Sequence, residues 1–157
     1  MSIDSKDKDF IKNILINDEG LKLFPYVDCC SQHWKKCGCK NKGDLTIGVG
    51  RNLDKYGITE AEAIYLLDNN IQDSVTQIER NFGSWFSKLN SPRKMVIISM
   101  AFNMGVNGLK TFQKMIKSIQ SGDFNSAANQ MMMSTWSSQV KKRAVILSEI
   151  MKSGILN

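Results

Sequence analysis

The sequence predicts an α+β fold that is predominantly α-helical, in which a small N-terminal lobe holds the β-structure and a larger helical lobe lies across a cleft from it. Residues 45–53 alternate aliphatic residues with Gly48 and Gly50, a pattern typical of a short strand and turn. From Thr59 onward, apolar residues recur at helical spacing. With 157 residues, 42% of them hydrophobic, the chain is long enough for one compact domain over residues 1–157.

The first expected element is an amphipathic helix over about residues 6–17. Apolar residues recur at helical spacing between Phe10 and Leu15, and Gly20 follows as a stop signal. Glu19 is therefore expected just past the C-terminal end of this helix.

Two long helices are expected after the strand and turn. Thr59 and Glu62 form a capping box, and the helix that they open continues to about Ile78 before a break at residues 81–83. The next helix is apolar on nearly all sides and ends at Gly105, so we expect it to be central and buried. Further helices are expected over about residues 109–120, 123–133 and 137–152.

The net charge of +6 is unevenly distributed along the chain. Nine Lys and Arg but only two acidic residues follow position 90, a net charge of +7, whereas the first ninety residues carry −1. A basic half suits a polyanionic partner such as nucleic acid, an anionic membrane or an acidic wall polymer, and it equally suits ordinary solvated helix faces.

Composition also bears on cellular location. No run of apolar residues is long enough to span a membrane. The charged N-terminus lacks the apolar core and cleavage site of a signal peptide. We therefore expect a protein that is made in a reducing cytoplasm.

Two carboxylates and a hydroxyl in the first third of the chain are suited to splitting a glycosidic bond. Partial burial at the floor of a cleft disfavours the charged form of a carboxyl group, so Glu19 could donate a proton to the leaving oxygen. Asp28, together with the Thr46 hydroxyl, could hold and deprotonate a water on the opposite face of the sugar, which is the inverting arrangement. Taken alone, this pair of acidic residues favours a solvated loop over a catalytic site.

Longer stretches of sequence favour the catalytic interpretation. They are Asp18–Asp28, Leu45–Leu53, Gly57–Ala63, Met100–Gly105, Phe112–Ile116, Gly122–Phe124 and Trp136–Ala144. Together they closely resemble the phage-type lysozymes of glycoside hydrolase family 24, over nearly the whole chain from about Phe10. The resemblance implies a lysozyme-like fold and a muramidase, which hydrolyses the β-1,4 bond between N-acetylmuramic acid and N-acetylglucosamine in peptidoglycan.

The resemblance also implies catalytic roles for Glu19, Asp28 and Thr46, with no cofactor for catalysis. The spacing from Glu19 to Asp28 fits the family pattern. Thr46 is carried over by its Thr-Ile-Gly context, because a longer segment than in the family separates it from Asp28.

Three further polar residues are candidates for binding substrate. Arg51 stands where some relatives have histidine, and it could pair with Glu19, line the cleft or form a merely structural salt bridge. Arg143, near Trp136, could contact substrate or anchor helices. Asn103, on the central helix, could reach the cleft or make a capping or core hydrogen bond.

An insertion over about residues 29–43 contains all four cysteines and the only histidine. The candidate metal ligands are Cys29, Cys30, His33, Cys37 and Cys39. Such clustering in a chain without a signal peptide favours a structural Zn²⁺ ion, with the nearby lysines easing the excess thiolate charge. Disulfides formed after release into the periplasm are the alternative.

We therefore expect a monomeric phage endolysin whose partner is peptidoglycan, with no nucleic acid partner and no transmembrane segment. It would wait in the host cytoplasm until a separate membrane pore opens. A lytic transglycosylase on the same fold, which would dispense with Asp28 and release anhydro sugars, is one alternative. A nonenzymatic module that binds wall polymer or nucleic acid is another.

Overall fold

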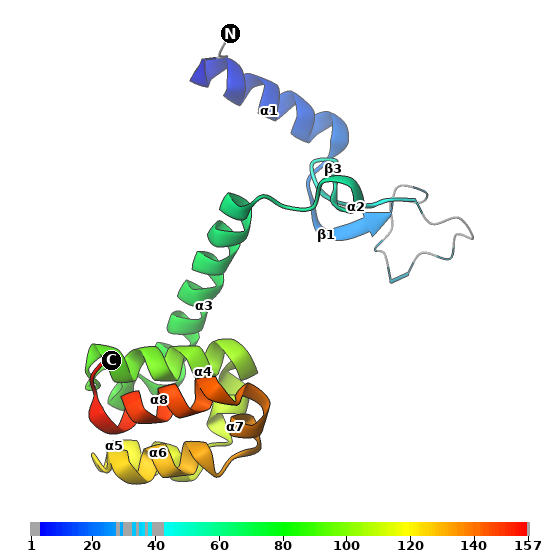
Figure 1. The fold of residues 1–157 in the computed structure, drawn as a ribbon. Helices are drawn as coiled ribbons and strands as arrows, with labels where there is room; N and C mark the ends of the chain where they lie inside the picture. Colours follow the sequence, from blue (N-terminus) through cyan, green and yellow to red (C-terminus); the bar gives the residue numbers. More distant parts are fainter. Residues whose placement is uncertain are drawn as a thin grey trace. The chain divides into compact units, whose positions relative to one another are not determined.

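The structure is a computed structural model that describes residues 4–27, 29, 33, 35–36, 38 and 43–156. The chain forms two compact units, an N-terminal unit over Met1–Ala63 and a C-terminal unit over Ile64–Asn157. The first contains a small antiparallel sheet and the second is helical (Figure 1). The predicted α+β, predominantly helical class is therefore confirmed.

The N-terminal unit consists of a helix, a three-stranded sheet and a short helix. These elements are α1 (Ser5–Glu19), β1 (Lys22–Val27), β2 (Leu45–Gly48), β3 (Arg51–Asn52) and α2 (Leu53–Tyr56). The strands pair in the order β1-β2-β3, so β2 is central. The predicted strand and turn over residues 45–53 correspond to β2, β3 and the start of α2, whereas the sequence pattern did not indicate β1.

Strand β1 is irregular. Its residues Lys22 and Tyr26 pair with Gly48 and Thr46 of β2, so four steps along β1 match only two along β2. Pro25 lies in this bulge, a position at which strands tolerate a residue without a backbone N–H.

The C-terminal unit is built from helices around an apolar core. Helix α3 begins at the end of the first unit, and the set is α3 (Glu60–Phe86), α4 (Ser91–Lys110), α5 (Gln113–Gln120), α6 (Phe124–Met132), α7 (Thr135–Val140) and α8 (Lys142–Ser153). Helix α8 packs against α4, α6 and α7, and α5 packs against α6. The largest fully buried side chains are Ile78, Val96, Ile97, Met100, Leu109, Met115, Met131 and Met151. Three of these lie between residues 96 and 100 of α4, which confirms that this helix contributes to the core.

Capping and stop signals in the sequence predicted some helix ends correctly. The backbone N–H of Thr59 donates to the Glu62 carboxylate (2.7 Å) and the N–H of Glu62 donates to the Thr59 hydroxyl (3.2 Å), so the capping box is confirmed. Gly105 has φ 73° and ψ 163°, a conformation that interrupts α4 at the predicted stop.

Two predicted helix limits are wrong. Helix α3 continues through residues 81–83 to Phe86, because Phe82 and Trp85 face the core and their burial outweighs the cost of a helical glycine. The predicted helix over residues 137–152 is divided between α7 and α8 at Lys141, which adopts φ 49°. Among the described helices, none is long and apolar enough to cross a membrane.

Candidate active site

Glu19 is the last residue of α1, so the expected position just past the helix is wrong by one residue. Gly20 follows with φ 74°, and its N–H donates to the carbonyl of Ile16 (3.0 Å). Glycine adopts this positive φ without a steric penalty, so the chain turns away directly after the carboxylate. The side chain of Glu19 is exposed, and the described part of the N-terminal unit does not supply the partial burial expected from the sequence.

The Glu19 carboxylate lies against the turn between β2 and β3. A Cβ atom on Gly50 would lie 3.8 Å from Oε2 of Glu19. Gly48 and Gly50 have φ of 69° and 70°, so the tight turn requires residues without side chains at both positions. Because this turn directly follows β2, its contact with Glu19 places the candidate acid beside the strand that carries Thr46.

Thr46 is held in the middle of the sheet. It pairs with Tyr26 on β1 and with Asn52 on β3, and only 3% of its surface is exposed. Its hydroxyl donates to the carbonyl of Asp44 (3.3 Å). Asp28 directly follows β1 and lies outside the described residues. The structure therefore brings Glu19 and the strand of Thr46 into one unit and leaves the position of Asp28 as a prediction.

A polar network that the sequence pattern did not reveal holds the strand of Thr46. The Asn52 amide donates to the Asp44 carboxylate (2.6 Å), and the backbone N–H of Leu45 donates to the Asp54 carboxylate (2.7 Å). Asn52 also caps α2 with its side-chain oxygen. An asparagine directly before an aliphatic residue is a recognised helix-capping signal, and it was the one available clue to this network.

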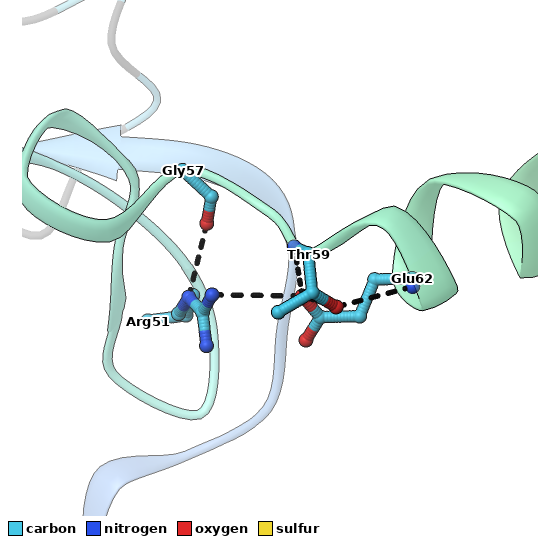
Figure 2. Close-up of polar contacts among 4 residues, drawn as sticks. All are labelled: Arg51, Gly57, Thr59 and Glu62. Atoms are coloured by element: carbon cyan, nitrogen blue, oxygen red, sulfur yellow. Dashed lines mark hydrogen bonds and ion pairs between the residues drawn. The ribbon is translucent and has the colours of Figure 1, made fainter.

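Arg51 is fixed by contacts other than the one with Glu19 considered above. Its Nη2 lies 3.5 Å from Oε2 of Glu62, and its Nε donates to the carbonyl of Gly57 (3.0 Å), as Figure 2 shows. The same Glu62 oxygen accepts the hydroxyl of Thr59 (2.9 Å). Arg51 therefore forms a structural ion pair, as one of the alternatives has it, but with Glu62 and not with Glu19, because the helix cap already orients the Glu62 carboxylate. Contact of Arg51 with substrate stays a prediction.

Glu62 is favoured in its ionised form. Hydrogen bonds from the backbone N–H and the hydroxyl of Thr59 lower the pKa of the Glu62 carboxyl. Burial opposes this with a smaller effect, and the charge of Arg51 lowers the pKa by the smallest amount. The contact between Arg51 and the start of α3 is thus an ion pair at neutral pH.

Asn103 lies on α4 in the C-terminal unit, where it anchors a buried tryptophan. Its Oδ1 accepts the indole N–H of Trp136 (3.1 Å), and Trp136 is only 3% exposed. Phe112 meets the Trp136 ring edge-on, with ring centres 6.5 Å apart. These contacts match the core hydrogen bond that was considered as an alternative, and substrate binding by Asn103 stays a prediction.

Arg143 also belongs to the C-terminal unit, at the start of α8. It is exposed and lines an apolar hollow of about 350 Å³ together with Leu67, Ile71, Met95 and Phe102. The hollow offers a charged group beside apolar surface, and the role of Arg143 toward substrate stays a prediction.

The metal site predicted in the insertion is only partly within the described residues. Cys29 is exposed, and His33 forms a β-bridge with Tyr26. Cys30, Cys37 and Cys39 lie outside the described residues. No three Cys, His, Asp or Glu side chains come together as metal ligands in the part of the chain that is described. The structural zinc ion is therefore untested and stays a prediction.

Comparisons with known proteins decide the family. The sequence model of the phage lysozyme family matches residues 17–149, a range that runs from before Glu19 to beyond Arg143. The chain belongs to the phage lysozyme family. Its relatives include probable T4-type lysozyme 1 of Dictyostelium discoideum, which is 30% identical over 94% of this chain and 96% of the relative. Probable T4-type lysozyme 2 of the same organism is 25% identical over 93% of this chain and 95% of its own length.

A third relative is much longer than this chain. The pre-baseplate central spike protein Gp5 of Enterobacteria phage T4 is 31% identical over 91% of this chain, and the match covers 28% of the relative. As a member of the phage lysozyme family, the present chain is a lysozyme, an enzyme of the muramidase type for which the family implies peptidoglycan as substrate. The α+β fold with a small sheet and a larger helical part agrees with this family.

Proposed function

We propose that this lysozyme hydrolyses the β-1,4 bond between N-acetylmuramic acid and N-acetylglucosamine, with Glu19 as general acid and with Asp28 and Thr46 positioning the water. The observation that carries the proposal is the Glu19 carboxylate against the β2–β3 turn, in the same unit as the fixed strand of Thr46. A proton donor and a water-binding group in one small unit are what hydrolysis of a glycosidic bond requires.

The proposed reaction is a single displacement. Glu19 transfers its proton to the glycosidic oxygen as the bond to the anomeric carbon breaks. Asp28 takes a proton from the water, whose oxygen attacks that carbon from the opposite face while the Thr46 hydroxyl orients it. The product is a reducing sugar with inverted configuration, and NMR of the first product before mutarotation tests this outcome. A retained configuration would contradict the assignment of Asp28 and Thr46 to a water.

The general acid is tested by digestion of purified peptidoglycan with the wild type, Glu19→Gln and Asp18→Asn. Asp18 is the matched control because it is the neighbouring exposed carboxylate on α1. We expect Glu19→Gln to lower the rate at least about 100-fold, the usual contribution of a general acid, and Asp18→Asn to stay near the wild type. Equal melting temperatures would show that all three proteins are folded. Full activity of Glu19→Gln would overturn the proposal.

The products of the same digestion distinguish hydrolysis from the transglycosylase reaction. Mass spectrometry should detect a reducing-end muramic acid, since water is the proposed nucleophile. A 1,6-anhydro product would show that the sugar's own hydroxyl attacks, and it would exclude the proposed hydrolysis.

We also propose that the enzyme lyses bacteria from within, from the cytoplasm and through a separate membrane pore. Membership of the phage lysozyme family supports this role. Expression in a bacterial host should cause lysis only after the inner membrane is permeabilised, which culture turbidity measures. Lysis without permeabilisation would contradict the need for a pore.

A further inference from the structure

A surface on the N-terminal unit that includes neither Glu19 nor Thr46 combines exposed apolar side chains with lysines. We name it the β1 patch, and it consists of Leu21, Lys22, Leu23, Phe24, Lys35 and Lys36. Leu23 is 75% exposed and Phe24 is 71% exposed, which is unusual for two neighbouring large apolar residues in a strand. Leu21 is 56% exposed.

The bulge in β1 accounts for this exposure. In a regular strand, successive side chains point to opposite faces, so one of two neighbours faces the covered side of the sheet. The extra residues between Lys22 and Tyr26 break this alternation, and Pro25 lies in the same segment. Leu23 and Phe24 are therefore both left in contact with solvent.

Two lysines of the insertion, Lys35 and Lys36, are connected to the same strand through His33. His33 forms a β-bridge with Tyr26, and its ring centre lies 6.2 Å from that of Phe24. Lys36 donates its backbone N–H to the His33 carbonyl (2.7 Å), and Lys35 donates its backbone N–H to Nδ1 of His33 (3.2 Å). Lys35 and Lys36, which are both exposed, are thus held near the apolar side chains through their contacts with His33.

A shallow hollow lies within this surface. It measures about 250 Å³ and is lined by Leu21, Lys22, Leu23, Phe24, Tyr26 and His33. None of these residues has a carboxylate or carboxamide group, the groups that usually complement sugar hydroxyls. Exposed leucine and phenylalanine beside lysines are typical of segments that enter the interface of an anionic bilayer.

We propose that the β1 patch binds the surface of an anionic lipid bilayer, with Leu23 and Phe24 entering the interface and the lysines contacting anionic headgroups. Apolar insertion and electrostatic attraction are each weak alone, and the two together give reversible attachment to the bilayer. The patch excludes Glu19 and Thr46, so this binding is independent of the proposed hydrolysis. A lysozyme attached in this way would be held next to the membrane that faces its substrate.

The test is sedimentation of the full chain with vesicles of phosphatidylcholine alone or mixed with phosphatidylglycerol. We expect binding to the mixed vesicles only, and weaker binding as salt is raised, because salt screens the lysines. Leu23→Ser/Phe24→Ser should weaken this binding at least about tenfold. The matched control is Ile155→Ser/Leu156→Ser, an adjacent pair that is 61% and 52% exposed in the other unit and should bind as the wild type does.

A second pair of variants tests the charge. Lys35→Gln/Lys36→Gln should weaken binding about fivefold for each lysine. Lys141→Gln/Lys142→Gln removes the same charge from adjacent exposed lysines of the C-terminal unit and should have little effect. An equal loss in both pairs would show that total charge alone drives binding, and it would overturn the patch assignment.

The remaining outcomes separate this inference from the proposed function. The apolar variant should digest soluble peptidoglycan fragments at the wild-type rate, because none of its changes touches Glu19 or Thr46. Unchanged vesicle binding by this variant would overturn the membrane proposal and leave the hydrolase intact. Lost binding to insoluble peptidoglycan with unchanged vesicle binding would assign the patch to the wall and would also overturn the proposal.

Discussion

The two units of this lysozyme are stabilised in different ways. Helices α3 to α8 share one continuous apolar core, whereas Val27 and Thr46 are the buried side chains among the described residues of the N-terminal unit. There the strands are held by the side chains of Asp44, Asn52 and Asp54. The proposed chemistry thus lies where a few hydrogen bonds set the geometry. Single polar substitutions should affect activity there, and apolar substitutions should affect stability in the other unit.

The largest expected difference is between two Leu→Ala variants. Leu109 in α4 is fully buried, so Leu109→Ala should lower the free energy of unfolding by about 3 kcal/mol through lost burial and a new cavity. Leu23→Ala, at a side chain that is 75% exposed, should change it by less than about 0.5 kcal/mol. Urea unfolding of both variants measures the two values. Similar losses would show that the N-terminal unit also relies on apolar packing.

Two asparagines allow the polar contribution to be compared between the units. Asn52 caps α2 and donates to Asp44, while Asn90 caps α4 and donates to the Gly154 carbonyl (2.9 Å). Each Asn→Ala change should cost about 1 kcal/mol of stability through the lost cap. Only Asn52→Ala should also reduce peptidoglycan digestion, because it loosens the strand of Thr46. An equal loss of digestion rate in the two variants would contradict a specific role for Asn52 in the site.

The smallest expected effect concerns two capping carboxylates, one in each unit. Hydrogen bonds from Thr59 lower the pKa of Glu62 from its ordinary 4.5, and hydrogen bonds from Ser126 lower the pKa of Asp123 from its ordinary 3.8. A lowered folded-state pKa gives stability that is present above the ordinary value and is lost as pH falls through the folded value. The wild type should therefore lose stability in acid more steeply than Glu62→Gln or Asp123→Asn.

Melting temperatures between neutral and acidic pH measure this difference. Glu60→Gln is the control for Glu62, since Glu60 lies in the same first turn of α3 and its carboxylate makes no hydrogen bond or ion pair with the described residues. It should follow the wild type at every pH. A variant of Glu62 that melts in parallel with the wild type would contradict a stabilising role for its ionised form.

The structural features that could be predicted from the sequence are the local ones. The Thr59 and Glu62 cap and the stop at Gly105 depend on neighbouring residues, so the sequence is sufficient to indicate them. Residues 81–83 resemble a turn, but burial of Phe82 decides in favour of helix, and that burial depends on helices distant in sequence.

In the candidate site too, local features could be predicted and contacts between residues distant in sequence could not. The position of Glu19 at the end of a helix was predicted to within one residue, because Gly20 marks the end. The partner of Arg51 could not be predicted, since Glu62 reaches it only because the intervening chain, α2 and Gly57, folds back toward β3. Networks such as that of Asp44 and Asn52 depend in the same way on the pairing of strands.

The bulge in β1 has a consequence for self-association. An exposed edge strand with leucine and phenylalanine is a template on which a second chain can extend the sheet into an aggregate. Pro25 removes one backbone donor from this edge, and the shift between Lys22 and Tyr26 breaks the repeat that an added strand would need to follow. The same irregularity that exposes Leu23 and Phe24 thus makes this edge a poorer template for another copy of the enzyme.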